Sequence, residues 1–149
     1  SDTGMLMARS PQPTAQAAYL DDSSPNLGAI YENVIAQELT AQGIPLYYYM
    51  AKKHGEVDFI ADTNADSVMP FEVKSGRSYR THAAIDAVLA NAEYRISQGV
   101  VLSRSNIAQD GGTTYLPLYA TYCLRDVCNL ASPSTVSTIG DFSLTVHPV

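Results

Sequence analysis

The feature that most constrains the fold is the stretch 55–76, which reads GEVDFIAD, a short polar connector, and then MPFEVKSG. Apolar and polar residues alternate on both sides of the connector. Alternation with a period of two is typical of half-buried strands, so the stretch predicts two consecutive strands, 55–62 and 68–74.

Side chains of a strand point alternately to the two faces of a sheet. If the apolar faces of the two strands join one core, Asp58, Glu72 and Lys74 emerge together on the opposite face. The apolar side chains expected to share the core face are Val57, Phe59, Ala61, Phe71 and Val73.

Two carboxylates beside a lysine fit a site for a divalent cation. Hard oxygen ligands suit Mg²⁺ or Mn²⁺. A bound metal lowers the pKa of a water ligand and neutralises charge on a phosphate, and a nearby lysine stabilises the charge that develops. The alternative is an ion-pair cluster on a sheet face, because exposed strand positions favour charged residues.

The remaining elements complete an α/β (α+β) chain, with a mixed central sheet flanked by helices. We expect the strand at 114–119 to lie at an edge of the sheet because it contains Pro117. His82, at a helix start, is expected to be a capping or surface residue. The predicted order is helix 27–42, strands 45–50, 55–62 and 68–74, helix 81–91, and strands 99–103 and 114–119.

The first predicted helix carries two glutamates near its apolar stripe. On a helical wheel Glu32 lies at the edge of the stripe and Glu38 near its middle, so either side chain is a candidate for a polar site next to the core. A solvated or locally paired glutamate is the alternative for both. The stripe consists of Leu27, Ile30, Tyr31, Val34, Ile35 and Leu39.

Composition describes an ordinary globular domain that crosses no membrane. The chain has 149 residues, 46% of them hydrophobic and 16% charged, and no apolar run approaches the ~20 residues of a membrane span. Cys123 and Cys128 are expected to be reduced thiols, and we expect a cytoplasmic protein. The sequence lacks a Gly-x-x-x-x-Gly-Lys-Ser/Thr loop, which excludes ATP hydrolysis through such a loop.

The net charge of −6 weighs against a nucleic-acid partner, although basic residues gather in the middle third. Lys52 and Lys53 lie at a turn between strands, where they are either a solvated hairpin tip or contacts to a phosphate. Arg77 and Arg80 follow Lys74 in a loop, where the same two interpretations apply.

Several separated motifs resemble the PD-(D/E)xK nuclease superfamily, with its restriction-endonuclease-like αβββαβ core. More narrowly, they resemble the uncharacterised C-terminal domain of archaeal-type AAA ATPases. The segments that carry this resemblance are DTGM (2–5), GAIYENV (28–34), EVDF (56–59) with EVKSG (72–76), and LPLYA (116–120).

The resemblance implies a metal-dependent DNA endonuclease domain in which Glu32, Asp58 and Glu72 ligate or position Mg²⁺ or Mn²⁺. Lys74 would serve the nucleophile. The alternative is a non-catalytic accessory domain that binds DNA or protein and retains the nuclease fold.

The same resemblance implies an ATPase domain earlier in the full-length chain. Because the sequence does not begin with Met, we expect a fragment of something longer; a homodimer stays open. The expected organisation is an N-terminal arm at 1–26, the nuclease-like domain at 27–125 and a C-terminal tail at 126–149.

Overall fold

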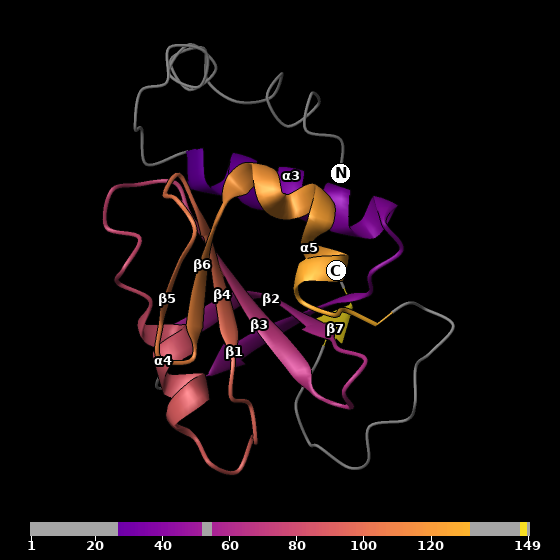
Figure 1. Ribbon diagram of the computed structural model, residues 1–149, viewed down its shortest axis with the longest axis vertical. Helices are drawn as coiled ribbons and strands as arrows, with labels where there is room; N and C mark the ends of the chain where they lie inside the picture. Colours follow the sequence, from indigo (N-terminus) through magenta and orange to yellow (C-terminus); the bar gives the residue numbers. More distant parts are fainter. Residues whose placement is uncertain (1–26, 52–54, 132–146, 149) are drawn as a thin grey trace.

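A mixed seven-stranded sheet flanked by helices forms the part of the chain that the computed structural model describes, residues 27–51, 55–131 and 147–148 (Figure 1). The strand order is β5-β6-β4-β3-β2-β1-β7. The helical elements are α3 (Leu27–Ala41), α4 (Ala83–Ala90), the 3₁₀ helix η1 (Leu118–Cys123) and α5 (Leu124–Val127). The strands are β1 (Leu46–Ala51), β2 (Gly55–Asp62), β3 (Val68–Lys74), β4 (Gly99–Ser103), β5 (Ala108–Asp110), β6 (Thr113–Pro117) and β7 (His147–Pro148).

The predicted class is confirmed, and β2, β3 and β4 have the predicted bounds. The connectivity follows from the lengths of the connections. β1, β2 and β3 are antiparallel neighbours separated by three and five residues of chain, whereas β3 and β4 are parallel and joined through α4. A parallel pair needs such a crossover, because the chain must return to the same end of the sheet.

The prediction of an edge strand at 114–119 is wrong. β6 lies between β4 and β5, and the chain turns into η1 at Leu118. The edge is β5, whose three residues are too few to show a sequence period. β5 pairs only with Thr113–Tyr115, so Pro117 lies beyond the part of β6 that needs backbone donors toward β5.

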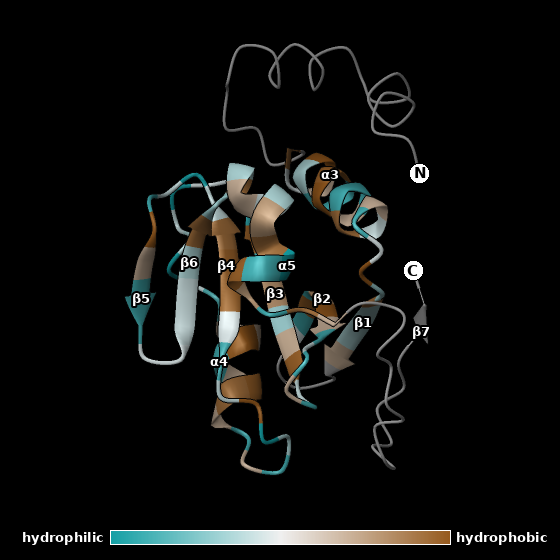
Figure 2. Cartoon of the chain, turned by 45° about the vertical axis from the view of Figure 1, so that its right-hand side comes forward, coloured by the Kyte–Doolittle hydropathy of each residue, from teal (hydrophilic) through white to brown (hydrophobic). Residues whose placement is uncertain are grey.

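Helices cover both faces of the sheet. The largest core cluster joins α3, η1 and α5 to one face, and α4 packs on the other face (Figure 1). β4 is buried along its whole length between the two layers and is coloured largely as hydrophobic in Figure 2, as expected for a central strand. The side chains below 2% exposure include Leu39, Phe71, Ile85, Val100, Val101, Leu102 and Leu124.

The α3 stripe is narrower than the sequence suggests. Leu27, Ile30, Ile35 and Leu39 are buried, but Val34 is 44% exposed, so its inclusion in the buried stripe was wrong. Because α3 packs on the sheet with one side only, the side of its predicted stripe that turns away from the sheet stays in solvent.

Residues just after α5 pack against the sheet. Leu130 is buried and forms a bridge with Thr63, and the Ala131 N–H donates to the Asp62 carbonyl over 2.8 Å. The N-terminal arm at 1–26 and most of the predicted tail lie outside the described residues.

Candidate functional site: carboxylates around the end of β3

β2 and β3 separate at Asp58, and the Asp58 side chain occupies the separation. The last paired residues are Phe59 and Phe71. Beyond them Asp58 Oδ2 accepts a hydrogen bond from the Val73 N–H at 2.7 Å. A side-chain carboxylate thus satisfies a backbone donor near the point where the ladder stops, which fixes the carboxylate beside β3.

An irregularity in β2 changes the faces that strict alternation predicts. Between the pairs Tyr47–Ile60 and Tyr49–Val57, β1 advances two residues while β2 advances three, the count of a β-bulge. Val57 consequently packs with Ile60 in the α4-side cluster, whereas Phe59 belongs to the α3-side core. The expectation that Val57 and Phe59 share one face is therefore wrong.

Glu72 and Lys74 lie two residues apart on β3 and form an ion pair. The Glu72 side chain is 8% exposed and the Lys74 side chain 31%, so the ammonium is the partner that solvent reaches. Lys74 contacts Oε1, while the buried Oε2 of Glu72 has no hydrogen-bond partner among the described residues. A buried carboxylate oxygen without a donor is costly, which makes this atom unusual.

Asp58 is the most perturbed acid of the site. Burial is the main cause that raises the pKa of its carboxyl from 3.8 to about 7. The hydrogen bond from Val73 N–H and the charge of Lys74 lower the pKa, while Glu32 and Glu72 raise it. These interactions show that the structure brings together the four residues that the sequence singled out as catalytic.

Glu32, rather than Glu38, is the helix glutamate of this site. Burial and Glu56 raise the pKa of Glu32, and Lys74 lowers it. Glu38 is exposed, and its Oε1 accepts from the Gln42 amide over 3.4 Å.

The first turn of α3 adjoins the end of β3. A Cβ placed on Gly28 would lie 3.7 Å from Glu32 Oε1 and 3.8 Å from Ser75 Oγ. The start of the helix is therefore close to the residue that follows Lys74, which explains why Glu32 interacts with that lysine.

Glu56 is a neighbour that the sequence analysis did not single out as functional. It is exposed, it acts on Glu32, and a hydrogen bond with it raises the pKa of Tyr48. Its position two residues before Asp58 was the available signal. Any site built here has a fourth carboxylate at its rim.

The donor set fits a magnesium-type cation only in part. No three Asp, Glu, His or Cys side chains within residues 27–51, 55–131 and 147–148 are grouped to hold an ion together. Mg²⁺ in proteins is commonly held by one or two carboxylates, with waters and substrate phosphates as the other ligands. Asp58 and Glu72 meet that requirement, since the unpartnered Oε2 of Glu72 is the oxygen that a cation would satisfy; Glu32 is nearby.

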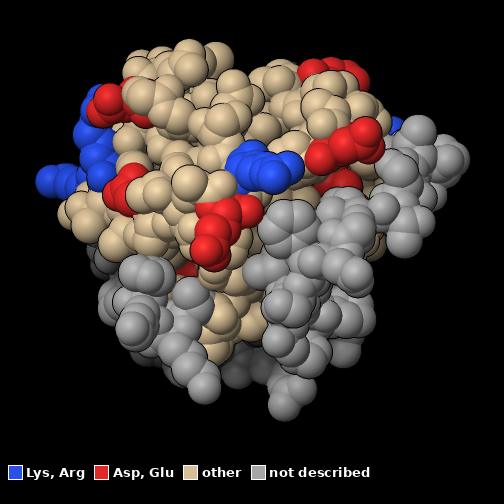
Figure 3. All heavy atoms as spheres, turned by 90° about the horizontal axis from the view of Figure 1, so that it is seen from below, with Lys and Arg blue, Asp and Glu red and all other residues tan. Residues whose placement is uncertain are grey.

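The predicted DNA-binding residues are distributed unevenly. Lys52 and Lys53 lie outside the described residues, and Arg77 is exposed in the loop after β3. The Arg80 guanidinium lies over the rings of Tyr79 and Tyr115, at 5.7 and 5.3 Å from their centroids, and 3.8 Å from Asp110. The face shown in Figure 3 carries acidic groups in several places and no continuous basic surface among its described atoms.

His82 is buried, so the interpretation of it as a surface residue is wrong. It occupies the N-cap position of α4, as the alternative interpretation expects, but its side chain makes no capping hydrogen bond. Its Nε2 lies 2.6 Å from the Tyr115 hydroxyl, and its Nδ1 lies 2.9 Å from Asp86 Oδ1. The contact with Tyr115 attaches the start of α4 to β6.

Comparisons with known proteins give one match. The family model of a domain of unknown function, DUF4143, matches residues 27–121. No curated protein and no solved structure matches the chain. Within the described part of the chain, no helix has the length and apolar character needed to span a membrane.

Proposed function

Because this chain belongs to the DUF4143 family, a domain of unknown function, we propose its activity from the site itself: metal-dependent hydrolysis of DNA phosphodiesters by an endonuclease domain. The observation that carries the proposal is that the partly buried site holds more carboxylates than positive charges. Glu32, Asp58 and Glu72 interact with a single lysine, the pKa of Asp58 is about 7, and Glu72 Oε2 lacks a partner among the described residues. A divalent cation would relieve both conditions.

The residues of the chain would divide the chemistry among them. Asp58 and Glu72 would hold the cation, with Glu32 as a third or water-mediated ligand. When bound, the metal supplies an activated water and neutralises charge on the phosphate. Lys74, the solvent-accessible member of its ion pair, would stabilise the negative charge that develops on the attacked phosphate.

The order of the elements supports this proposal. Helix α3, the antiparallel strands β1 to β3, helix α4 and the parallel strand β4 follow one another in the αβββαβ order of PD-(D/E)xK nucleases, which the sequence motifs resemble. The carboxylates lie around the carboxyl end of β3, and the carboxyl ends of strands are where α/β sheets bind ligands.

Placement at the C-terminal end of an AAA-type ATPase is also a proposal, with the ATPase domain N-terminal in the same full-length chain. It is supported by the four sequence segments that resemble such domains. The ATPase would then move or present the DNA, and the domain described here would act on it.

Two observations favour a second candidate, a non-catalytic accessory domain that binds DNA or protein. The described residues hold no ready-made group of three ligands, and the chain carries a net charge of −6. In that case the Glu72–Lys74 pair would stabilise the sheet without any metal.

Calorimetric titration with Mn²⁺, followed by a cleavage screen, separates the two candidates. The wild type is compared with Asp58→Asn, and Asp126→Asn, which removes an exposed carboxylate on α5, is the charge control. We expect binding of about millimolar affinity or tighter, equivalent to at least ~4 kcal/mol, that is lost only in Asp58→Asn.

Cleavage of duplex, flap or single-stranded DNA should require both Mn²⁺ or Mg²⁺ and an intact Asp58. If no substrate is cut and DNA binding is unchanged in Asp58→Asn, the endonuclease proposal is wrong and the accessory function is supported.

A further inference from the structure

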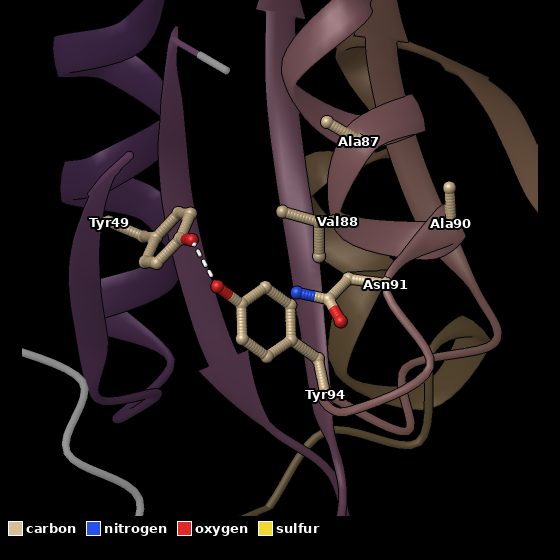
Figure 4. Close-up of a pocket in the computed structure, with 6 residues that line it drawn as sticks. All are labelled: Tyr49, Ala87, Val88, Ala90, Asn91 and Tyr94. Carbon is tan, nitrogen blue, oxygen red and sulfur yellow. Dashed lines mark hydrogen bonds between the residues drawn. The ribbon is translucent and has the colours of Figure 1, made fainter. Parts of the chain in front are cut away.

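A cavity of about 250 Å³ lies between α4 and β1, on the α4 side of the sheet (Figure 4). Two tyrosine rings form one side of it: Tyr49 belongs to β1, and Tyr94 follows α4. The two rings meet edge to face, with their centroids 6.1 Å apart. Small apolar side chains of α4 form the other side. The residues that line the cavity are Tyr49, Ala87, Val88, Ala90, Asn91 and Tyr94.

Hydrogen-bond donors converge on this cavity. The hydroxyls of Tyr49 and Tyr94 are hydrogen-bonded over 2.9 Å, and the hydroxyl that accepts keeps its own proton for a further partner. Burial, and then the contact with Tyr94, raise the pKa of Tyr49 to about 12, so this phenol is protonated at neutral pH. The amide oxygen of Asn91 accepts from the Glu93 N–H over 3.0 Å, and the amide nitrogen is turned toward the tyrosines (Figure 4). The Asn91 nitrogen therefore offers N–H donors to a ligand.

These features define the kind of ligand that the cavity suits. No charged side chain is among the described residues that line it, so an ionised group would gain no ion pair there. The donors suit a carbonyl oxygen or a ring nitrogen, and the apolar wall of α4 suits the face of a flat ring. The volume lies below the ~300–1,000 Å³ of pockets for drug-sized molecules, which limits the ligand to one small heterocycle. An uncharged flat ring with acceptor atoms at its edge is the chemistry of a nucleobase.

The cavity lies close to the carboxylates around the end of β3 and on the same face of the sheet as Glu72. Tyr49 packs with Val57 in a cluster on the α4 side. Glu72 pairs with Val101, which belongs to the other cluster on that side, and paired residues share a face. Tyr49 also pairs with Val57, the residue before Asp58. The backbones of Tyr49 and Asp58 are therefore within roughly 10 Å of each other.

We propose that this cavity binds one unpaired base of the DNA substrate, while a phosphate of the same strand meets the carboxylates at the end of β3. The inference rests on the proposed function for the identity of the substrate as DNA, and it adds that the substrate contains unpaired nucleotides. The base lies against the apolar wall of α4. Its acceptor atoms take hydrogen bonds from the Asn91 amide and from the free hydroxyl proton of the tyrosine pair.

The state of the base follows from the shape of the site. A base inside a duplex cannot enter such a cavity, because its edge is paired and its faces are stacked. The net charge of −6 favours the same reading: the chain has few cations with which to hold phosphates, whereas contacts to a base need no positive charge. The substrate class is therefore single-stranded DNA, or duplex DNA with a single-stranded flap.

Binding to a fluorescent oligothymidine, measured by anisotropy in EDTA, tests the cavity without metal or cleavage. Asn91→Asp keeps an acceptor for the Glu93 N–H but has no N–H donor for a base. Ala90→Leu fills the cavity from an exposed position on α4. Gln109→Glu is the control, because it makes the same amide-to-acid change at an exposed position on β5, at the opposite edge of the sheet. Circular dichroism checks that each variant is folded.

We expect Asn91→Asp and Ala90→Leu to weaken the binding of oligothymidine about tenfold, as the loss of one base contact would, and Gln109→Glu to bind like the wild type. The wild type should also bind an abasic strand of the same length about tenfold more weakly, or worse. Unchanged binding in both cavity variants, or equal affinity for the abasic strand, would overturn the proposal. If free thymidine binds as tightly as the oligonucleotide, the ligand is a free nucleoside and the assignment to DNA is wrong.

The same variants separate this inference from the proposed function. If oligothymidine binds through the cavity but no DNA is cut in Mn²⁺, the endonuclease function fails and the base site belongs to the accessory function. If cleavage depends on Asp58 while Asn91→Asp and Ala90→Leu bind and cut like the wild type, the endonuclease function stands and the base site is wrong.

Discussion

Replacing Asp58 with asparagine removes a buried charge while keeping the shape and the hydrogen bond of the side chain. The asparagine carbonyl can accept from the Val73 N–H, as Asp58 Oδ2 does over 2.7 Å. The substitution therefore isolates the cost of holding an ionised carboxylate between Glu32 and Glu72 in the absence of a metal.

The magnitude follows from the pKa. Folding raises the pKa of Asp58 from 3.8 to about 7, chiefly by burial. Each pKa unit corresponds to ~1.36 kcal/mol, so the cost at pH 8 approaches about 4 kcal/mol, a large part of the 5–15 kcal/mol that typically stabilises a domain. Allowing for partial hydration of the carboxylate, we expect Asp58→Asn to gain about 2–4 kcal/mol at pH 8.

The gain should depend on pH in a definite direction. The folded state holds the Asp58 proton more tightly than the unfolded state. The protonated Asp58 carboxyl contributes fully to the free energy of unfolding below about pH 4, and this contribution is lost as the pH rises to about 7. Asp58→Asn should therefore match the wild type near pH 4 and exceed it increasingly up to pH 7, with a constant difference above.

Urea unfolding in EDTA between pH 4 and pH 8 measures this difference, with Asp126→Asn as the control for losing one exposed negative charge. Adding Mn²⁺ at ten times its dissociation constant should then stabilise the wild type by about 1.4 kcal/mol and leave Asp58→Asn unchanged. If Asp58→Asn is no more stable at pH 8 than at pH 4, relative to wild type, the buried-charge argument is refuted.

Three further substitutions have definite expected outcomes. Lys74→Met leaves Glu72 without its cation and should cost about 1–3 kcal/mol in urea unfolding, and combining it with Glu72→Gln should recover part of the loss; an additive double variant would contradict the pairing. Gly112→Ala should cost about 2 kcal/mol or more, because the new Cβ would lie 2.5 Å from the Ser97 carbonyl oxygen; an unchanged unfolding midpoint would contradict this packing. Arg80→Ala should lower the slope of log K for DNA binding against log salt concentration by about 0.9, the contribution of one phosphate contact. An unchanged slope would exclude Arg80 from the interface.

The central strands were predictable from sequence because local and tertiary requirements agree there. The stretch 55–76 alternates with the period of a strand, and its two strands have the predicted bounds. The pairing of Glu72 with Lys74 follows from the same period. The choice of Glu32 over Glu38 needed the structure, because Gly28 and Glu32 lie beside Ser75 at the end of β3, whereas Glu38 is exposed and accepts from Gln42.

Other features have no local signal. The bulge in β2 is a property of its pairing with β1, and nothing in the β2 sequence indicates that Val57 and Phe59 pack on different faces. The run after β6 is apolar enough for a strand, but it forms η1. His82 is buried through contacts with a residue 33 positions later, which no window of local sequence includes.

The start of α3 has a consequence for how the domain would meet a substrate. Since Gly28 lies beside Glu32 and Ser75, the chain enters the helix next to the carboxylates. A group attached to the chain just before this helix would therefore be tethered at the site, and tethering by a short linker gives an effective concentration of the order of millimolar. A nucleic acid held by a module on that side would reach Asp58 by a local search, so a weak intrinsic affinity of the domain would suffice.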